Sequence, residues 1–326
     1  MTRDIPRLVL LLPAGLLLLL ALADPTLTLP RKTHDYVFVL DITGSMNVAD
    51  AGSGSAKPAR LEFGKQLLRE ALEEMACGSR AGLGVFTEHR TFLLFAPVEI
   101  CDNHLVISTM IDEIDGRMAW AQLSEVAKGL YSGIETVATL ASTDGGSGGQ
   151  PNLVFMTDGH EAPPVHPTLR PKFRGQPGEV RGLIAGIGGP EPMAIPYLDE
   201  NNQVAGYWAH DEVMQVDRHS VGRPSSNGAE AMAGVDSSDL QERMARGAEH
   251  LSSLREGYLQ QLAVETGLDY LRTTTPGAFA KALLDSRYAT RPSIETNAAW
   301  IPAALSLLCL VYLFGAQLVT RPERAL

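Results

Sequence analysis

The sequence has no excess of basic residues, and it has few cysteines. Lysine and arginine together number 27 against 38 aspartates and glutamates, which gives a formal net charge of -11. A nucleic-acid-binding surface needs a basic patch, so this balance argues against one, while it permits cation binding or a basic partner. Three cysteines are too few for a disulfide-scaffold protein and for a zinc site with four thiolates.

Two common motifs of enzymes are also missing. The sequence contains neither the phosphate-binding Gly-x-x-x-x-Gly-Lys-[Ser/Thr] loop nor the zinc-binding His-Glu-x-x-His pair, so an NTPase interpretation lacks support. What is present is a globular composition, with 45% apolar and 20% charged residues, which is enough to bury a core. The length of 326 residues is long for one ordinary compact domain and short for two.

Apolar residues concentrate near both ends of the chain. Arg3 and Arg7 precede an apolar run at 8–23 that ends in Ala21-Leu-Ala23, the A-x-A form of a signal peptidase site. The run is short for a membrane span, which needs roughly 20 residues. Residues 1–23 are therefore predicted to be either a cleaved signal peptide or an uncleaved N-terminal membrane anchor.

The second apolar run, residues 298–319, has the length of a membrane span and is predicted to be a transmembrane helix. Trp300 and Tyr312 lie toward its ends, and Arg321 and Arg324 follow it. Arginines that flank a span stay on the cytoplasmic side. The main domain is thus expected to be tethered to a bacterial inner membrane and to face the periplasm.

Between the two ends, predicted strands alternate with predicted helices. Buried-type apolar runs predict strands at 36–40, 81–87, 91–96, 152–156, 182–187 and 268–271, and helical patterns cover 57–76, 103–114, 124–140, 251–266 and 277–284. This alternation predicts an α/β fold with a mostly parallel central sheet and helices on both faces. Residues 189–249 are interpreted as an insertion with a hairpin around Asn201 and Asn202.

Oxygen-bearing side chains follow two of the predicted strands. Asp41, Thr43 and Ser45 come directly after the first strand, and Asp158 comes directly after the strand at 152–156. Ligands of such sheets bind at the carboxyl ends of the strands, and carboxylates and hydroxyls suit Mg²⁺, Mn²⁺ or Ca²⁺ better than Zn²⁺. The alternatives are that Thr43 and Ser45 cap the following helix and that Asp158 is an ordinary turn residue.

The segments at 41–46 (Asp-Ile-Thr-Gly-Ser-Met) and 155–159 (Phe-Met-Thr-Asp-Gly) resemble the two signatures of von Willebrand factor type A (VWA) domains, and the resemblance covers residues 35–285. It implies a Rossmann-like fold with a metal-ion-dependent adhesion site, or MIDAS. Four of the five ligands of that site match directly as Asp41, Thr43, Ser45 and Asp158.

The fifth ligand, a threonine in the family, is assigned to Ser124. This serine lies five residues before the pair Gly129-Leu130, as the family spacing requires, but the usual Gly-Gly-Thr context is absent. The alternative for Ser124 is a plain helix N-cap.

The resemblance implies a non-enzymatic binding module. A divalent cation, Mg²⁺ first and Ca²⁺ or Mn²⁺ as alternatives, would complete its coordination with an acidic side chain of a protein partner. Residues 158–164 and 251–259 further resemble the VWA proteins encoded with periplasmic methanol dehydrogenase, which implies a role in maturation of that enzyme and insertion of its Ca²⁺. The alternatives are a metal-handling chaperone that delivers Ca²⁺ directly, and an aerotolerance-type VWA membrane protein that acts with a MoxR-type ATPase.

Two further pairs of residues are candidates with open alternatives. His160 and Glu161 either extend the metal site or contact a partner, or they are solvated loop residues. Cys77 precedes the strand at 81–87 and Cys101 follows the strand at 91–96, so an antiparallel hairpin would bring them together. In an oxidising periplasm they would form a disulfide, and the alternative is two free thiols.

Overall fold

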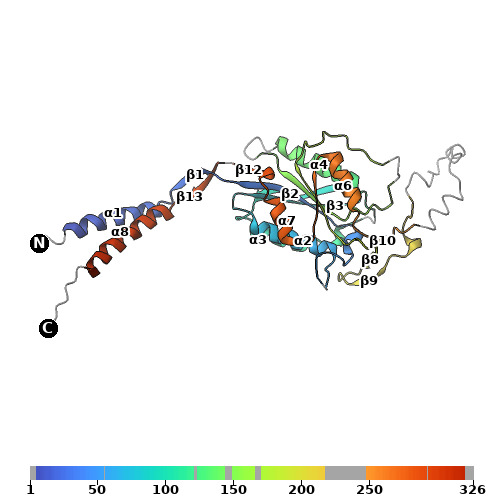
Figure 1. Ribbon diagram of the computed structural model, residues 1–326, viewed down its shortest axis with the longest axis horizontal. Helices are drawn as coiled ribbons and strands as arrows, with labels where there is room; N and C mark the ends of the chain where they lie inside the picture. Colours follow the sequence, from blue (N-terminus) through green and yellow to red (C-terminus); the bar gives the residue numbers. More distant parts are fainter. Residues whose placement is uncertain are drawn as a thin grey trace. The chain divides into compact units, whose positions relative to one another are not determined.

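The computed structural model describes residues 5–54, 56–120, 123–143, 149–165, 170–216, 247–291 and 293–319. The chain forms two compact units, the terminal segments up to Arg31 and from Arg291 onward, and the segment Lys32–Thr290 (Figure 1). The second unit contains the predicted strands and helices, and it is described first.

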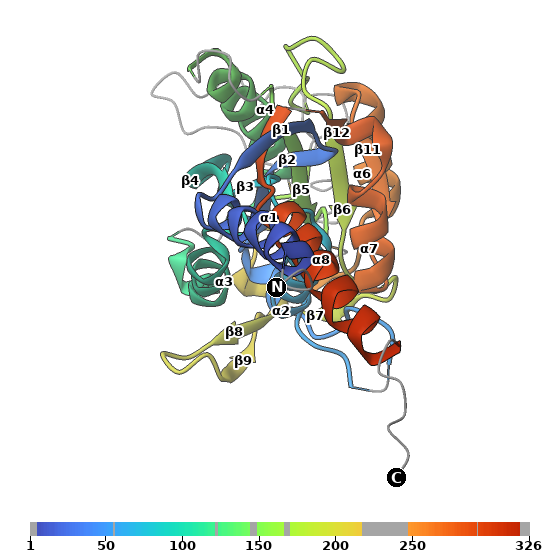
Figure 2. The ribbon, with the colours of Figure 1, turned by 90° about the vertical axis from the view of Figure 1, so that its left-hand side faces the viewer.

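A seven-stranded sheet, counted over the described residues, runs through the Lys32–Thr290 unit in the order β11-β6-β5-β2-β3-β4, and β12 pairs with β2 off this path (Figure 2). Its strands are β2 (Thr33–Asp41), β3 (Arg80–Thr87), β4 (Arg90–Glu99), β5 (Asn152–Thr157), β6 (Gly182–Gly186), β11 (Asp269–Arg272) and β12 (Ala289–Thr290). Only β4 on β3 and β12 on β2 pair antiparallel. The predicted mostly parallel α/β sheet is confirmed.

Helices cover both faces of the sheet (Figure 1). They are α2 (Arg60–Glu74), α3 (His104–Glu113), α4 (Val126–Thr143), α6 (Glu256–Thr266) and α7 (Pro276–Leu283). The central strand β2 alternates between two cores, because successive side chains of a strand point to opposite faces. Phe38 and Leu40 pack in the core of α2, α3 and α7, whereas Val37 and Val39 pack in the core of α4 and α6.

The segment after β6 departs from the predicted pattern in one place. A helix was expected over 251–266, but α6 begins only at Glu256. Leu251 and Ser252 form the short strand β10 (Leu251–Ser252), which pairs antiparallel with β7 (Met193–Ala194). Long-range pairing with a segment some sixty residues earlier therefore overrides the local helical pattern.

The predicted insertion contains the expected hairpin. It consists of β8 (Pro196–Leu198) and β9 (Val204–Tyr207), which pair antiparallel, and its turn includes Asn202 with a φ of 60°. Asparagine tolerates this left-handed conformation better than most residues. The remainder of the predicted insertion, residues 217–246, lies outside the described residues.

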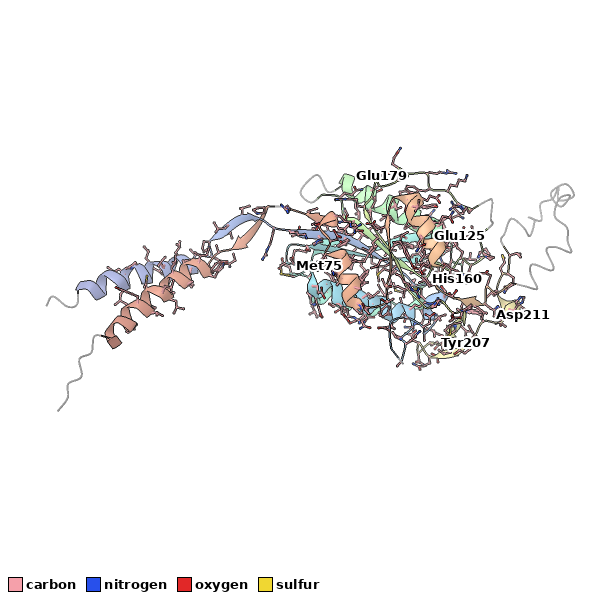
Figure 3. All side chains as sticks on the ribbon, in the orientation of Figure 1. Met75, Glu125, His160, Glu179, Tyr207 and Asp211 are labelled. Carbon is pink, nitrogen blue, oxygen red and sulfur yellow. A yellow bond between two sulfur atoms is a disulfide. The ribbon has the colours of Figure 1, made fainter. Side chains whose placement is uncertain are left out.

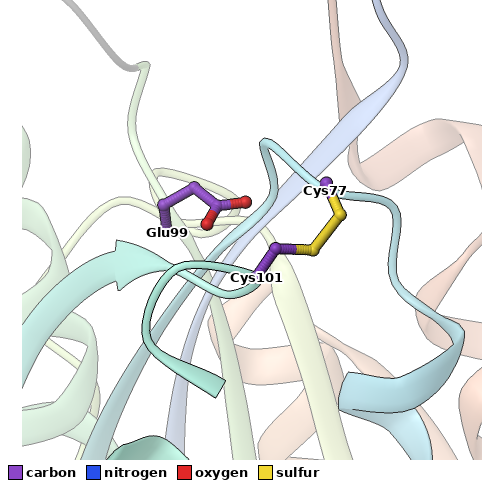
Figure 4. Close-up of side chains that lie close together, drawn as sticks. All are labelled: Cys77, Glu99 and Cys101. Atoms are coloured by element: carbon purple, nitrogen blue, oxygen red, sulfur yellow. A yellow bond between two sulfur atoms is a disulfide. The ribbon is translucent and has the colours of Figure 1, made fainter. Parts of the chain in front are cut away.

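Cys77 and Cys101 form a disulfide at the amino end of β3, with their Cα atoms 5.4 Å apart (Figure 4). The antiparallel pairing of β3 with β4 brings them together, as the hairpin argument predicts. Glu99 lies beside the bridge, where its carboxylate accepts hydrogen bonds from Gly78 N at 2.6 Å and Asp102 N at 2.7 Å. The carboxylate therefore ties the two cysteine-bearing loops together.

The terminal unit pairs the two apolar ends of the chain. Strands β1 (Thr26–Pro30) and β13 (Ser293–Asn297) pair antiparallel, and they lead to α1 (Ile5–Leu22) and α8 (Trp300–Val319). Ser306 Oγ in α8 donates a hydrogen bond to Ala14 O in α1 at 2.9 Å. A helix does form over most of 298–319, but no helix within the described ranges meets the length and apolarity that a membrane span requires, so the predicted transmembrane helix is not supported.

Candidate metal site

The first site loop leaves the carboxyl end of β2 and is folded by its own aspartate. Asp41 is fully buried. Its Oδ1 accepts hydrogen bonds from Thr43 N at 2.9 Å and Thr43 Oγ1 at 2.7 Å, and its Oδ2 accepts one from Thr157 Oγ1 at 2.6 Å. Thr43 makes no side-chain capping bond, and α2 begins only at Arg60. The structure therefore does not show the helix-capping alternative for Thr43.

The loop that follows the adjacent strand β5, which we call the third site loop, places a second buried carboxylate beside the first. Because β2 and β5 are parallel and in register, Asp41 and Asp158 end up at the same edge of the sheet. Asp158 is fully buried. Its Oδ1 accepts a hydrogen bond from His160 N at 2.9 Å, and its Oδ2 accepts one from Ser252 Oγ at 3.0 Å.

Ser124 lies in the second site loop, which precedes α4, and its backbone fixes this loop to the third site loop. Its N and O atoms both form 2.8 Å hydrogen bonds with Ala162. Its Oγ is buried and has no hydrogen-bond partner among the described residues, so it does not act as the N-cap of α4. That role falls to Glu161, whose Oε1 accepts hydrogen bonds from Ala127 N at 3.0 Å and Tyr258 Oη at 2.6 Å.

A glycine sets the position of α4 and hence of the Ser124 loop. A Cβ atom on Gly129 would lie 2.1 Å from Phe86 Cε2, much closer than any real contact. Phe86 is fully buried in β3, so the helix can approach the sheet this closely only with glycine at position 129.

An arginine that the sequence did not single out completes the charge balance of the site. Arg60 is fully buried. Its Nε and Nη2 atoms each donate a 2.7 Å hydrogen bond to Asp50, and its Nη1 pairs with Asp158 Oδ2. Nη1 also donates to Ser252 Oγ at 2.6 Å. Arg60 therefore connects the helix α2, the third loop and the strand β10.

The two site carboxylates differ in pKa because only one of them has a cationic partner. Burial, and then repulsion by Asp158, raises the pKa of Asp41 to about 7. Burial is the largest influence on Asp158 and acts in the same direction, but the Arg60 charge, the His160 ring and hydrogen bonds from the His160 backbone and Ser45 together outweigh it, so the pKa of Asp158 is lowered. Of the pair, Asp41 is the carboxylate left without a compensating charge.

The site opens into a cavity of about 470 Å³. Thr43, Ser45 and Ser124 form what we call the hydroxyl wall. An apolar wall comes mostly from the segment 195–214, and its members are Ile195, Pro196, Leu198, Trp208, Val213 and Met214.

His160 also lines the cavity, and Figure 3 places it at the same end of the domain as Tyr207. Burial lowers the pKa of His160 to about 4, so its ring is neutral at pH 7. Its ring nitrogens have no hydrogen-bond partner among the described residues.

The structure thus brings the five predicted metal ligands together, but in two layers. Thr43, Ser45 and Ser124 reach the cavity, whereas Asp41 and Asp158 lie fully buried and are not among the lining residues. The donor set is all oxygen, which suits a hard divalent cation. The unpartnered Oγ of Ser124 and the uncompensated carboxylate of Asp41 fit such an ion. Asp158 fits less simply, because it already shares a charge with Arg60.

Comparisons with known proteins give matches of low identity. No family model matches the sequence. A UPF0353 protein from Mycolicibacterium paratuberculosis is 26% identical over 169 residues, which make up 51% of this chain and 46% of that protein. The chain spans about half the length of this curated relative.

Three solved structures are similar at lower identity. An aerotolerance-related membrane protein from Bacteroides fragilis is 18% identical, with 77% of this chain and 96% of that chain covered and a TM-score of 0.47. A von Willebrand factor type A protein from Catenulispora acidiphila is 9% identical, with 79% and 43% covered and a TM-score of 0.37. An uncharacterized membrane spanning protein from Vibrio fischeri is 16% identical, with 76% and 94% covered and a TM-score of 0.28. Likeness at these identities concerns the fold alone.

Proposed function

We propose that the Lys32–Thr290 unit is a non-enzymatic, metal-ion-dependent protein-binding module of the VWA type. Asp41, Thr43, Ser45, Ser124 and Asp158 would hold a divalent cation, Mg²⁺ first and Ca²⁺ or Mn²⁺ as alternatives. The observation that carries the proposal is the hydroxyl wall, with the unpartnered Ser124 Oγ in front of two buried carboxylates. The cation would complete its coordination with a carboxylate from the partner.

The donor set favours docking over ion delivery. A storage or transfer site for Ca²⁺ surrounds the ion with carboxylates, whereas here only two of the five proposed ligands are carboxylates and one of them is paired with Arg60. The reading as a chaperone that hands over Ca²⁺ directly therefore takes second place.

Calorimetric titration of the metal-free full chain with MgCl₂ tests the proposal. Asp41→Asn should abolish Mg²⁺ binding while the chain stays folded, as judged by circular dichroism. Asp112→Asn, which changes an exposed carboxylate on α3, should bind as the parent does. Equal Mg²⁺ binding by the Asp41 variant would refute the proposed site.

The cellular role stays a proposal. The similarities described above provide no link to methanol dehydrogenase, so maturation of that enzyme is no longer the leading candidate. A role of the aerotolerance type ranks first because one similar protein is described as an aerotolerance-related membrane protein, and the sequence resemblance adds a MoxR-type ATPase as the expected partner. Loss of aerobic growth in a deletion strain with normal methanol dehydrogenase activity would support this order, and the reverse phenotype would invert it.

We also infer that the module works in an oxidising compartment, in line with the predicted periplasmic location. The Cys77–Cys101 disulfide supports this inference, since disulfides persist mainly outside the cytosol. Thiol labelling in intact cells, followed by denaturation, should leave both cysteines unlabelled. Labelling of both without reductant would contradict the inference.

A further inference from the structure

The cavity in front of the hydroxyl wall is larger than one carboxylate group requires. Its volume of about 470 Å³ lies in the range of pockets that enclose whole small ligands. An ion-bridged contact through a single acidic group would leave the apolar wall without a partner. The apolar character of that wall therefore indicates that the ligand carries apolar groups beside its acidic group.

The apolar wall is anchored to the metal site at its amino end. Before the segment begins, Gly189 N donates a 2.9 Å hydrogen bond to Asp50 Oδ2. The strand β7, which directly precedes the segment, pairs with β10, where Ser252 bonds to both Arg60 and Asp158. The wall is thus held beside the hydroxyl groups by the same buried charges that organise the site.

A second feature of the cavity is a buried histidine whose ring makes no hydrogen bond among the described residues, with Glu249 Oε2 3.9 Å from its Nε2. His160 is 2% exposed, it lines the cavity, and neither ring nitrogen has a hydrogen-bond partner among the described residues. A neutral imidazole offers one donor and one acceptor. These are the groups that match a peptide unit, which itself carries one N–H donor and one carbonyl acceptor.

We propose that the cavity binds a peptide segment in which an acidic side chain stands next to bulky apolar side chains. The carboxylate would approach the cation at the hydroxyl wall, the apolar side chains would lie against the wall around Trp208, and the backbone would bond to His160. This inference rests on the proposed function, because it assigns the carboxylate to the same ion. It adds that the apolar neighbours select the partner.

Four synthetic peptides of equal length, all blocked at both ends, test the inference with the full chain in Mg²⁺. The first contains Leu-Asp-Leu between glycines, the second Leu-Asn-Leu, the third Ser-Asp-Ser, and the fourth Ser-Asn-Ser. Binding is followed by anisotropy of a label on the peptide. Replacing both leucines should weaken binding at least about tenfold, since one buried leucine is worth that much or more. Replacing the aspartate should remove the dependence on Mg²⁺.

Variants in the segment 195–214 test which residues contact the apolar side chains of the peptide. Trp208→Ser and, separately, Met214→Ser should weaken binding of the Leu-Asp-Leu peptide and leave binding of the Ser-Asp-Ser peptide unchanged. Val204→Ser is the matched control, because Val204 is exposed on the same hairpin and is not among the cavity-lining residues. An equal effect of all three variants on both peptides would count against the assignment.

Calorimetric titration with Mg²⁺ alone separates failure of this inference from failure of the proposed function. If Mg²⁺ binds but the leucine and serine peptides bind equally well, the peptide assignment is wrong and the metal-dependent module stands. If Mg²⁺ does not bind, both are wrong. A peptide with a free C-terminal carboxylate and no aspartate that binds more tightly than Leu-Asp-Leu would also overturn the assignment to an internal acidic side chain.

Discussion

The two ends of the central sheet are held together by different chemistry. At the amino end, a disulfide joins the loops around β3 and β4, and neutral side chains bond to backbone, as Asn152 Nδ2 does to Asp35 O at 3.1 Å and Tyr288 O at 3.0 Å. At the carboxyl end, Asp41, Asp158 and Arg60 are fully buried. Burial of charge is costly unless each charge is paired, so the carboxyl end holds an arrangement that stability alone does not require.

The amino end of the sheet therefore has a structural role, whereas the carboxyl end carries the candidate site. The amino end needs only to close the sheet, and a covalent bond with neutral hydrogen bonds does so. Both ends retain buried polar atoms without hydrogen-bond partners in the described residues, among them Asp35 Oδ1 and Asn152 Oδ1 at the amino end and Ser124 Oγ and the His160 nitrogens at the carboxyl end. Groups in this state destabilise a fold. Ser124 and His160 line the cavity, where a ligand would satisfy them.

The largest expected effect comes from removing the positive charge of Arg60 at the carboxyl end of the sheet. Arg60→Met would leave Asp50 and Asp158 buried without their partner, and breaking a buried pair in this way costs about 3–5 kcal/mol. Urea unfolding should show this loss in the free energy of unfolding. Arg69→Met is the matched control on the same helix, because the Arg69–Asp112 pair is exposed and such pairs contribute about 0–1 kcal/mol. Similar losses for both variants would remove the contrast between the two ends.

Opening the disulfide should have the next largest effect, and it tests the amino end. The bridge closes a loop with a sequence separation of 24, for which chain entropy predicts a stabilisation of about 3 kcal/mol. The double variant Cys77→Ser, Cys101→Ser should lose this amount in urea unfolding but keep its affinity for Mg²⁺. Titration of thiols in the denatured, unreduced parent should find only Cys309. A loss of Mg²⁺ affinity in the double variant would show that the two ends are coupled.

The capping carboxylate of α4 predicts a specific pH dependence. Burial raises the pKa of Glu161 from 4.5 to about 7, so the folded chain binds a proton there more tightly than the unfolded chain. Its contribution to stability is therefore present below about pH 4.5 and is lost as pH rises through about 7. Glu161→Gln should be more stable than the parent at pH 8, by on the order of 3 kcal/mol, and equally stable at pH 4.

Urea unfolding as a function of pH measures this difference. Glu135→Gln, an exposed change on the same helix, should shift the parent curve by a constant amount at most. His160, whose pKa is lowered to about 4, acts in the opposite direction, because stability is lost as pH falls from about 6.5 to about 4. Only the difference between parent and Glu161→Gln is therefore diagnostic, and parallel curves for these two would contradict the raised pKa of the buried Glu161 carboxyl.

The sequence predicted the sheet and the position of the site because both depend on local pattern. The strand β2 is a continuous apolar run, and the oxygen ligands follow directly where β2 and β5 end. Arg60 was not predictable in the same way. A charged residue at the first position of an amphipathic helix normally faces solvent, and its partner Asp158 is 98 residues away along the chain.

Neighbouring residues with similar side chains also took different roles that no local pattern separates. From the sequence, His160 and Glu161 share the same alternatives: an extension of the metal site, a partner contact, or solvated loop residues. Only His160 lines the cavity, whereas Glu161 caps α4. The position of α6 decides this outcome, because Tyr258 on that helix donates a hydrogen bond to Glu161, and that contact forms only in the folded chain.

The smallest expected effect concerns how closely α4 approaches the sheet. Gly129→Ala would place a Cβ atom 2.1 Å from Phe86 Cε2. The Phe86 ring is fully buried and packs on Phe155 with centroids 5.5 Å apart, so the helix rather than the ring has to move. Overpacking of this kind costs about 1–3 kcal/mol.

Because the loop that carries Ser124 is continuous with α4, the shift should also weaken Mg²⁺ binding measured by calorimetry. Gly257→Ala on α6 is the matched control, since a Cβ there meets nothing within 4 Å. Alanine at that position should stabilise the helix by up to about 1 kcal/mol and leave Mg²⁺ affinity unchanged. If Gly129→Ala is destabilised but binds Mg²⁺ like the parent, the packing of α4 does not set the position of Ser124, and the loop that carries it is held by its backbone bonds to Ala162 and Glu88.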